Sequence, residues 1–143
     1  MAIPLEEQAF DLLREKLNRF YVPNLAERKQ VLSWLGISSK FVRSFDGLQL
    51  GVENFKDITG PLDFDLIEVK ATQKFLPLLD SSPTGFFFGM TENEEMLLKI
   101  FGKKAHLCLV SVNPESRGYF LTDWERFQTL NMNKRIQYQI NMK

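Results

Sequence analysis

One apolar strand that carries a glutamate and a lysine two residues apart constrains this chain more than any other feature. Residues 64–71 read Phe-Asp-Leu-Ile-Glu-Val-Lys-Ala, directly after the turn-prone residues 60–63. Because side chains alternate between the two faces of a strand, Glu68 and Lys70 project from the same face. Burying both is costly unless they meet a metal ion, an anion or each other. The segment therefore predicts a polar site set into a folded core.

This pair of side chains suits the hydrolysis of phosphodiester bonds. Carboxylates hold a divalent cation that polarises the phosphate and activates a water, and an ammonium group can orient that water. Such a site needs a second carboxylate near Glu68. In a hairpin closed by residues 60–63, Asp57 lies opposite Leu66 or, after a two-residue slip, opposite Glu68, so it shares the Glu68 face in both registers. Asp57 is thus the leading second metal ligand, and Asp46 is the reserve.

The rest of the chain alternates between helical and strand patterns. Apolar spacing and capping residues predict three helices, over residues 4–20, 24–35 and 91–102. Period-two patterns and apolar runs predict strands over residues 41–45, 48–52, 64–71, 106–112, 118–121 and 136–140. A long loop ending in a short strand is expected over residues 75–90, and a helical turn over 122–127. The order is that of a mixed α/β fold.

Composition limits the size and class of the protein. With 143 residues, of which 44% are hydrophobic and 25% charged, we expect a single domain over residues 1–143, with a basic C-terminal extension from about residue 122. One cysteine, Cys108, and one histidine, His106, exclude a disulfide framework and a multi-cysteine zinc site. No apolar run reaches the roughly 20 residues that span a bilayer, and no signal peptide is recognisable. We expect a cytoplasmic protein without membrane contact.

The charge is balanced in total but not along the chain. Eighteen basic and eighteen acidic residues give a net charge of +0, yet residues 1–98 hold 10 basic and 15 acidic groups, and residues 99–143 hold 8 and 3. An acidic, cation-collecting part followed by a basic part suits a metal-dependent enzyme that holds phosphates. The residues predicted to contact nucleic acid are Gln73, Lys74, Lys103, Lys104, Arg117, Arg126, Lys134 and Arg135.

The spacing of Asp57 and Glu68-Val69-Lys70 resembles the PD-(D/E)XK motif of the restriction-endonuclease-like nuclease superfamily. Ten residues separate the two halves, and Lys56-Asp57 stands where the family has Pro-Asp. The resemblance covers residues 4–121 and implies an α-βββ-α-β core, with a central mixed sheet flanked by helices. It also implies Mg2+, with Mn2+ as its substitute, on Asp57 and Glu68, with Lys70 beside the attacking water. A glutamate on the first helix, Glu7 or Glu6, would complete the catalytic set.

Together these features favour a Mg2+-dependent endonuclease that cleaves double-stranded DNA site-selectively, in restriction, homing or repair. One domain carries one such site, so cutting both strands implies a homodimer or a higher homo-oligomer. Two alternatives stay open. The chain could keep the fold as a catalytically inactive module that binds nucleic acid or protein, or its nuclease chemistry could act on RNA.

Overall fold

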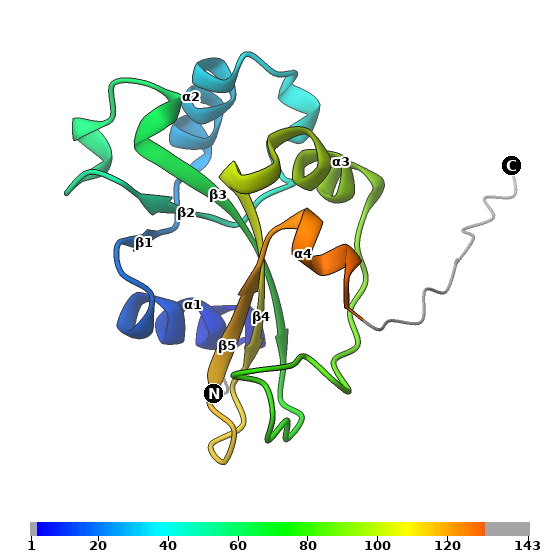
Figure 1. The fold of residues 1–143 in the computed structure, drawn as a ribbon. Coiled ribbons are helices and arrows are strands. Elements are labelled where there is room, and N and C mark those ends of the chain that lie inside the picture. The colour runs from blue at the N-terminus through cyan, green and yellow to red at the C-terminus, as the bar shows by residue number, and fades with distance from the viewer. Residues whose placement is uncertain (1–2, 131–143) are drawn as a thin grey trace, which may run out of the picture.

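The computed structural model describes residues 3–130 as a mixed α/β domain built on one five-stranded sheet (Figure 1). The strands lie in chain order across the sheet, and only β3 and β4 run parallel to each other. Their bounds are β1 Phe20–Tyr21, β2 Gly47–Leu50, β3 Phe64–Thr72, β4 Ala105–Ser111 and β5 Gly118–Thr122. The expected α/β class with a mixed sheet and flanking helices is confirmed.

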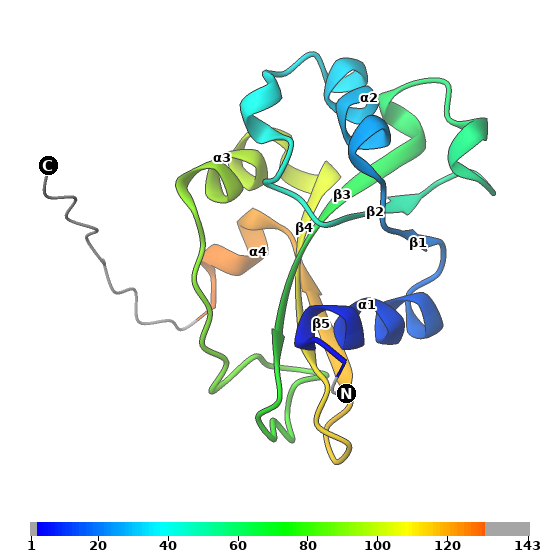
Figure 2. The same cartoon turned by 180° about the vertical axis from the view of Figure 1, so that it is seen from behind.

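Helices cover both faces of this sheet, as Figures 1 and 2 show from opposite sides. Helix α1 packs on one face against Ile67, Val69, Cys108 and Val110. The opposite face carries the larger core, to which α2 and α3 contribute. The helices extend over Leu5–Lys16 (α1), Leu25–Leu35 (α2), Glu92–Phe101 (α3) and Trp124–Gln128 (α4). Among residues 3–130, none of these helices has the length and apolar character needed to cross a bilayer.

The helix ends follow the capping signals in the sequence. Asn24 begins α2 with a reciprocal capping box to Glu27, and Gly36 ends it in the left-handed conformation, with φ of 69°, which glycine adopts without steric cost. Thr91 and Glu94 form the second capping box, at the start of α3. Both helices therefore lie where their caps predict them. Helix α1 is shorter than expected and ends at Lys16.

Strand β3 is buried on both faces, as its apolar run indicates. On one side β3 pairs with β4 in parallel, with Glu68 opposite Leu107 and Lys70 opposite Leu109. On the other side β2 pairs antiparallel, with Gly47 opposite Ile67. The predicted division of faces is confirmed, because Leu66 lies in the larger core and Ile67 and Val69 lie in the core under α1.

Three predicted segments differ from the structure. Residues 41–45 form no strand; a short 3-10 helix, Ser39–Phe41, and turns occupy this region. Residues 75–90 remain a loop without the expected terminal strand. The hairpin register proposed for Asp57 is wrong, because β2 pairs directly with β3 and residues 51–63 bulge out between them. The strand predicted over residues 136–140 lies outside the described residues.

Candidate active site

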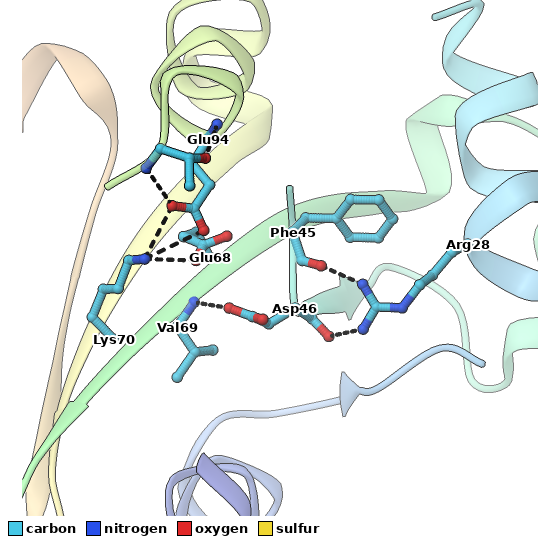
Figure 3. A network of polar contacts seen from close by, with 8 residues as sticks. Arg28, Phe45, Asp46, Glu68, Val69, Lys70 and Glu94 are labelled. Carbon is cyan, nitrogen blue, oxygen red and sulfur yellow. Dashed lines mark hydrogen bonds and ion pairs between the residues drawn. The ribbon is translucent and has the colours of Figure 1, made fainter. Parts of the chain in front are cut away.

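Three segments of the chain bring polar side chains together around β3 (Figure 3). Glu68 and Lys70 come from β3 itself, and Glu94 comes from the first turn of α3. Asp46 immediately precedes β2, and its backbone N–H donates to the carbonyl of Ile67 at 2.9 Å. Asp46 lies just outside the β2–β3 ladder, which ends with Gly47 opposite Ile67, and its carboxyl group interacts with that of Glu68.

Lys70 is held between two carboxyl groups. Its Nζ lies 3.2 Å from Oε1 of Glu68 and 3.1 Å from Oε1 of Glu94. The same Oε1 of Glu94 accepts from the backbone N–H of Thr91 at 2.7 Å, which is the return bond of the capping box. Glu94 thus closes the N-terminus of α3 and fixes the lysine at the same time. A long flexible side chain is in this way confined before any substrate arrives.

Asp46 is fixed by backbone contacts on both sides. Its Oδ2 accepts from the N–H of Val69 at 2.7 Å. The guanidinium of Arg28 donates to the carbonyl oxygens of Phe45 and Asp46, the latter at 3.0 Å, and lies over the Phe45 ring. Arg28 therefore holds the chain where it enters β2, and this in turn sets the position of the Asp46 carboxylate.

Burial makes Glu68 the most perturbed acid of the site. The side chain is only 5% exposed, and its Oε2 atom has no hydrogen-bond partner among the described residues. Desolvation, with the neighbouring carboxyl groups of Glu94 and Asp46, raises the pKa of Glu68 to about 11. A carboxyl group in this environment retains its proton at neutral pH. The unpaired oxygen and the raised pKa reflect the same shortage of positive charge at Glu68.

The neighbouring groups respond to the same environment. Burial raises the pKa of Asp46, although the hydrogen bond from the Val69 N–H lowers it in part. Burial would also raise the pKa of Glu94, but its bonds to Glu68, Thr91 and Lys70 lower it overall. Burial lowers the pKa of Lys70, yet Glu68 and Glu94 outweigh this effect and raise it. The lysine is thus an ammonium group at neutral pH.

The first helix brings Glu6 within electrostatic reach of this cluster. Partial burial and the charge of Asp46 raise the pKa of Glu6, and Arg28 and Lys70 act on it in the opposite direction. Both glutamates lie exposed in the first turn of α1. Of the two helix acids left open by the sequence, Glu6 thus interacts electrostatically with Asp46.

The structure does not bring Asp57 to Glu68. Asp57 ends the short 3-10 helix Phe55–Asp57, where its Oδ2 accepts from the N–H of Asn54 at 3.1 Å. Its side chain caps a loop and is exposed. The leading choice of second carboxylate is therefore replaced by the reserve, Asp46.

Most of the predicted nucleic-acid contacts lie away from the cluster, and several have partners of their own. Lys74 donates to the carbonyl of Gly85 at 3.1 Å, and Lys104 pairs with Asp65 at 3.0 Å. Gln73 is exposed at the end of β3, and Lys103 is exposed after α3. Arg117 and Arg126 lie beside β5. Lys134 and Arg135 fall outside the described residues.

The donor atoms of the cluster fit a divalent cation that keeps water or phosphate among its ligands. Within residues 3–130, no group of three or more histidine, cysteine, aspartate or glutamate side chains has an arrangement that would hold a metal ion. Mg2+, however, is usually bound by one or two carboxylates, with waters and substrate phosphates as its other ligands. Asp46 and Glu68 offer two neighbouring carboxyl groups, and Oε2 of Glu68 is buried without a partner. This donor set fits Mg2+ or Mn2+.

Sequence reasoning missed two residues of the cluster, Glu94 and Arg28. Glu94 is visible in the sequence as the third residue of a capping box, but this role does not reveal its second contact with Lys70. Arg28 lies in α2, 18 residues before Asp46, and no local pattern indicates that it reaches the backbone there. Both contacts depend on the packing of helices against the sheet.

Comparison of the chain with protein-family models, with curated proteins and with solved structures returned no match. The assignment of function therefore depends on the geometry of the cluster.

Removing the guanidinium of Arg28 tests its role in holding Asp46. Arg28→Met keeps an unbranched side chain but leaves the Phe45 and Asp46 carbonyls without their charged donor, so we expect a loss of about 2 kcal/mol of stability. Thermal unfolding measures the loss, and Lys29→Met, an exposed neighbour on the same helix, is the matched control. Equal melting temperatures for the two variants would show that Arg28 does not hold this segment.

Proposed function

We propose that this chain is a metal-dependent DNA endonuclease with a site of the PD-(D/E)XK type. One observation carries the proposal: the carboxyl group of Asp46, which accepts from the Val69 N–H, lies beside that of Glu68, and Lys70 contacts Glu68 from the same face of β3. Part of the topology supports it, because β1, β2 and β3 pair antiparallel in chain order, and α3 then leads from β3 to β4, which runs parallel to β3. Helix α2, which lies between β1 and β2, departs from the α-βββ-α-β order that the resemblance implies.

Asp46 and Glu68 would hold the cation. A bound Mg2+ supplies polarisation of the phosphate and a lowered pKa for an attacking water. The shortage of positive charge at Glu68 favours this role, since a cation there would replace the proton that the carboxyl group otherwise retains. Arg28 contributes indirectly by holding the backbone on which Asp46 stands.

Lys70 would act on the phosphate and the water. Its ammonium group is held in place by Glu94 and remains protonated, so it can orient a water molecule and stabilise the negative charge that develops on the phosphate oxygens. Since one chain offers one such cluster, cleavage of both strands of a duplex would require two copies.

DNA cleavage with and without the lysine tests this proposal. Purified protein should nick and then linearise supercoiled plasmid in Mg2+ or Mn2+, and EDTA should stop the reaction. Lys70→Ala should reduce the cleavage rate by at least about a hundredfold, as the loss of one charge-stabilising donor does elsewhere. Lys56→Ala, an exposed lysine outside the cluster, should keep the rate. Cleavage that survives both EDTA and Lys70→Ala would overturn the proposal.

The same experiment addresses a second function, that of a catalytically inactive nucleic-acid-binding module. The contact of Lys70 with two carboxyl groups favours it, because the ammonium is already engaged. This function predicts that the protein binds DNA without a metal ion. It also predicts that no cleavage occurs at any Mg2+ or Mn2+ concentration.

A further inference from the structure

A groove follows the outer edge of the sheet, on the far side of β4 from the candidate active site. It has a volume of about 470 Å3, and β5 forms its floor. Three cationic side chains line it, Lys16, Arg117 and Arg126, against one acid, Asp80. The groove is therefore positively charged, although the chain as a whole has no net charge.

Each of the two arginines has a partner beside the groove. The guanidinium of Arg117 lies 2.8 Å from the carboxylate of Glu15 at the end of α1. That of Arg126 lies over the ring of Phe120, with 4.9 Å to the centroid. Arginines anchored in this way present their remaining N–H groups in a defined direction, as recognition of phosphate requires.

The groove also contains an aromatic ring. Tyr119 lines it and is half-buried against the core under α1. Basic side chains that track a backbone, together with aromatic rings on which bases stack, are typical of grooves that bind single-stranded nucleic acid. A volume of 470 Å3 lies within the range of pockets for drug-sized ligands, so it suits one or two nucleotides but not a duplex.

Strand register connects this groove to the candidate active site. Lys70 pairs with Leu109 on β4, and Leu109 pairs with Phe120 on β5. Paired residues share a face of the sheet, and neighbouring strands lie about 4.8 Å apart, so Phe120 is roughly 10 Å from Lys70 across the sheet. Arg126, stacked on Phe120, thus marks the end of the groove nearest to the lysine.

We propose that the β5 groove binds a single-stranded segment of the DNA substrate, with phosphates on Lys16, Arg117 and Arg126 and a base on Tyr119. Its link to cleavage rests on the proposed function, to which it adds a substrate class: DNA with an unpaired segment beside the bond that is cut.

Binding of a fluorescein-labelled 12-nucleotide oligo-dT, measured by anisotropy in EDTA, tests the groove without any need for cleavage. The double variant Arg117→Glu/Arg126→Glu should bind at least tenfold more weakly, and the dependence of log affinity on log salt should become shallower by about 0.7 for each phosphate that the variant no longer neutralises. The control is Lys29→Glu/Lys56→Glu, which makes the same change of charge at exposed sites elsewhere and should bind as the unmodified protein does.

Substitutions at two further positions separate the contributions of charge and of the aromatic ring to binding. Asp80→Asn removes the one acid of the groove and should tighten binding, a gain that misfolding cannot produce. Tyr119→Leu should weaken binding about fivefold or more with an unchanged salt dependence, whereas Tyr119→Phe keeps the ring and the affinity.

The inference is overturned if both charge-reversal variants bind equally, or if a 12-base-pair duplex binds more tightly than the single strand. Groove-dependent binding without cleavage in Mg2+ would instead reject the proposed nuclease function and leave the groove assignment intact. Cleavage that is insensitive to the groove variants would reject this inference alone.

Discussion

Asp46→Asn is expected to lower the rate of Mg2+-dependent DNA cleavage by roughly a thousandfold, whereas Asp57→Asn should leave it within about twofold. Asparagine keeps an oxygen that can accept from the Val69 N–H, so the segment before β2 should still fold. It removes the negative charge, which a divalent cation needs. Asp57 caps a loop outside the cluster, and its substitution should affect local stability only.

Metal binding by the same variants can also be measured without cleavage, from the melting temperature. Mg2+ or Mn2+ should raise the melting temperature of the unmodified protein, because a ligand that binds only the folded state stabilises it. The increase should persist in Asp57→Asn and disappear in Asp46→Asn. If Asp57→Asn instead abolished both cleavage and the metal-dependent increase, Asp57 would be the metal ligand and the assignment of Asp46 would be wrong.

Glu68→Gln should make the metal-free protein more stable, although it should abolish cleavage. The pKa of Glu68 is raised to about 11 from its ordinary value of 4.5, so folding must keep a proton on this group at neutral pH. A raised carboxyl pKa costs stability once the pH exceeds 4.5, and the cost grows until the pH reaches the folded-state pKa. At pH 7 it amounts to about 3 kcal/mol. Glutamine has the same shape and avoids this cost.

Thermal unfolding in EDTA at several pH values measures the effect. Near pH 4.5 the melting temperatures of Glu68→Gln and the unmodified protein should agree, and by pH 8 the variant should melt several degrees higher. The groups that set this behaviour are Asp46, Glu94 and Lys70. Glu7→Gln, at an exposed helix position, should show no such trend. A variant less stable than the unmodified protein at pH 8 would contradict the prediction.

Local signals in the sequence predicted the elements that carry the site. The alternation along β3 placed Glu68 and Lys70 on one face. Asn24 as N-cap and the Thr91–Glu94 capping box located the first turns of α2 and α3. These features depend on residues within a few positions of one another. The sequence can therefore indicate which side chains share a face, but not which helix residue will meet them.

Pairing between distant segments was harder to predict, and Asp57 illustrates why. Its assignment assumed that the segment next to β3 in sequence is also its neighbour in the sheet. In the structure residues 51–63 form a loop with two 3-10 turns, and β2 pairs with β3 across it. Asp46 reaches Glu68 from just before β2, where its side chain accepts from the Val69 N–H. Likewise, Phe41 and Phe45 alternate as in a strand, but Ser38 caps a 3-10 helix there instead.

The capping box of α3 has a consequence for how the protein changes shape. Because one oxygen of Glu94 accepts from both the Thr91 amide and the Lys70 ammonium, fraying of the first helical turn and release of the lysine are one event. Amide hydrogen exchange at the start of α3 would then report on the lysine. A nucleic-acid strand that draws Lys70 toward its phosphate should speed exchange there, at a distance from any residue it touches.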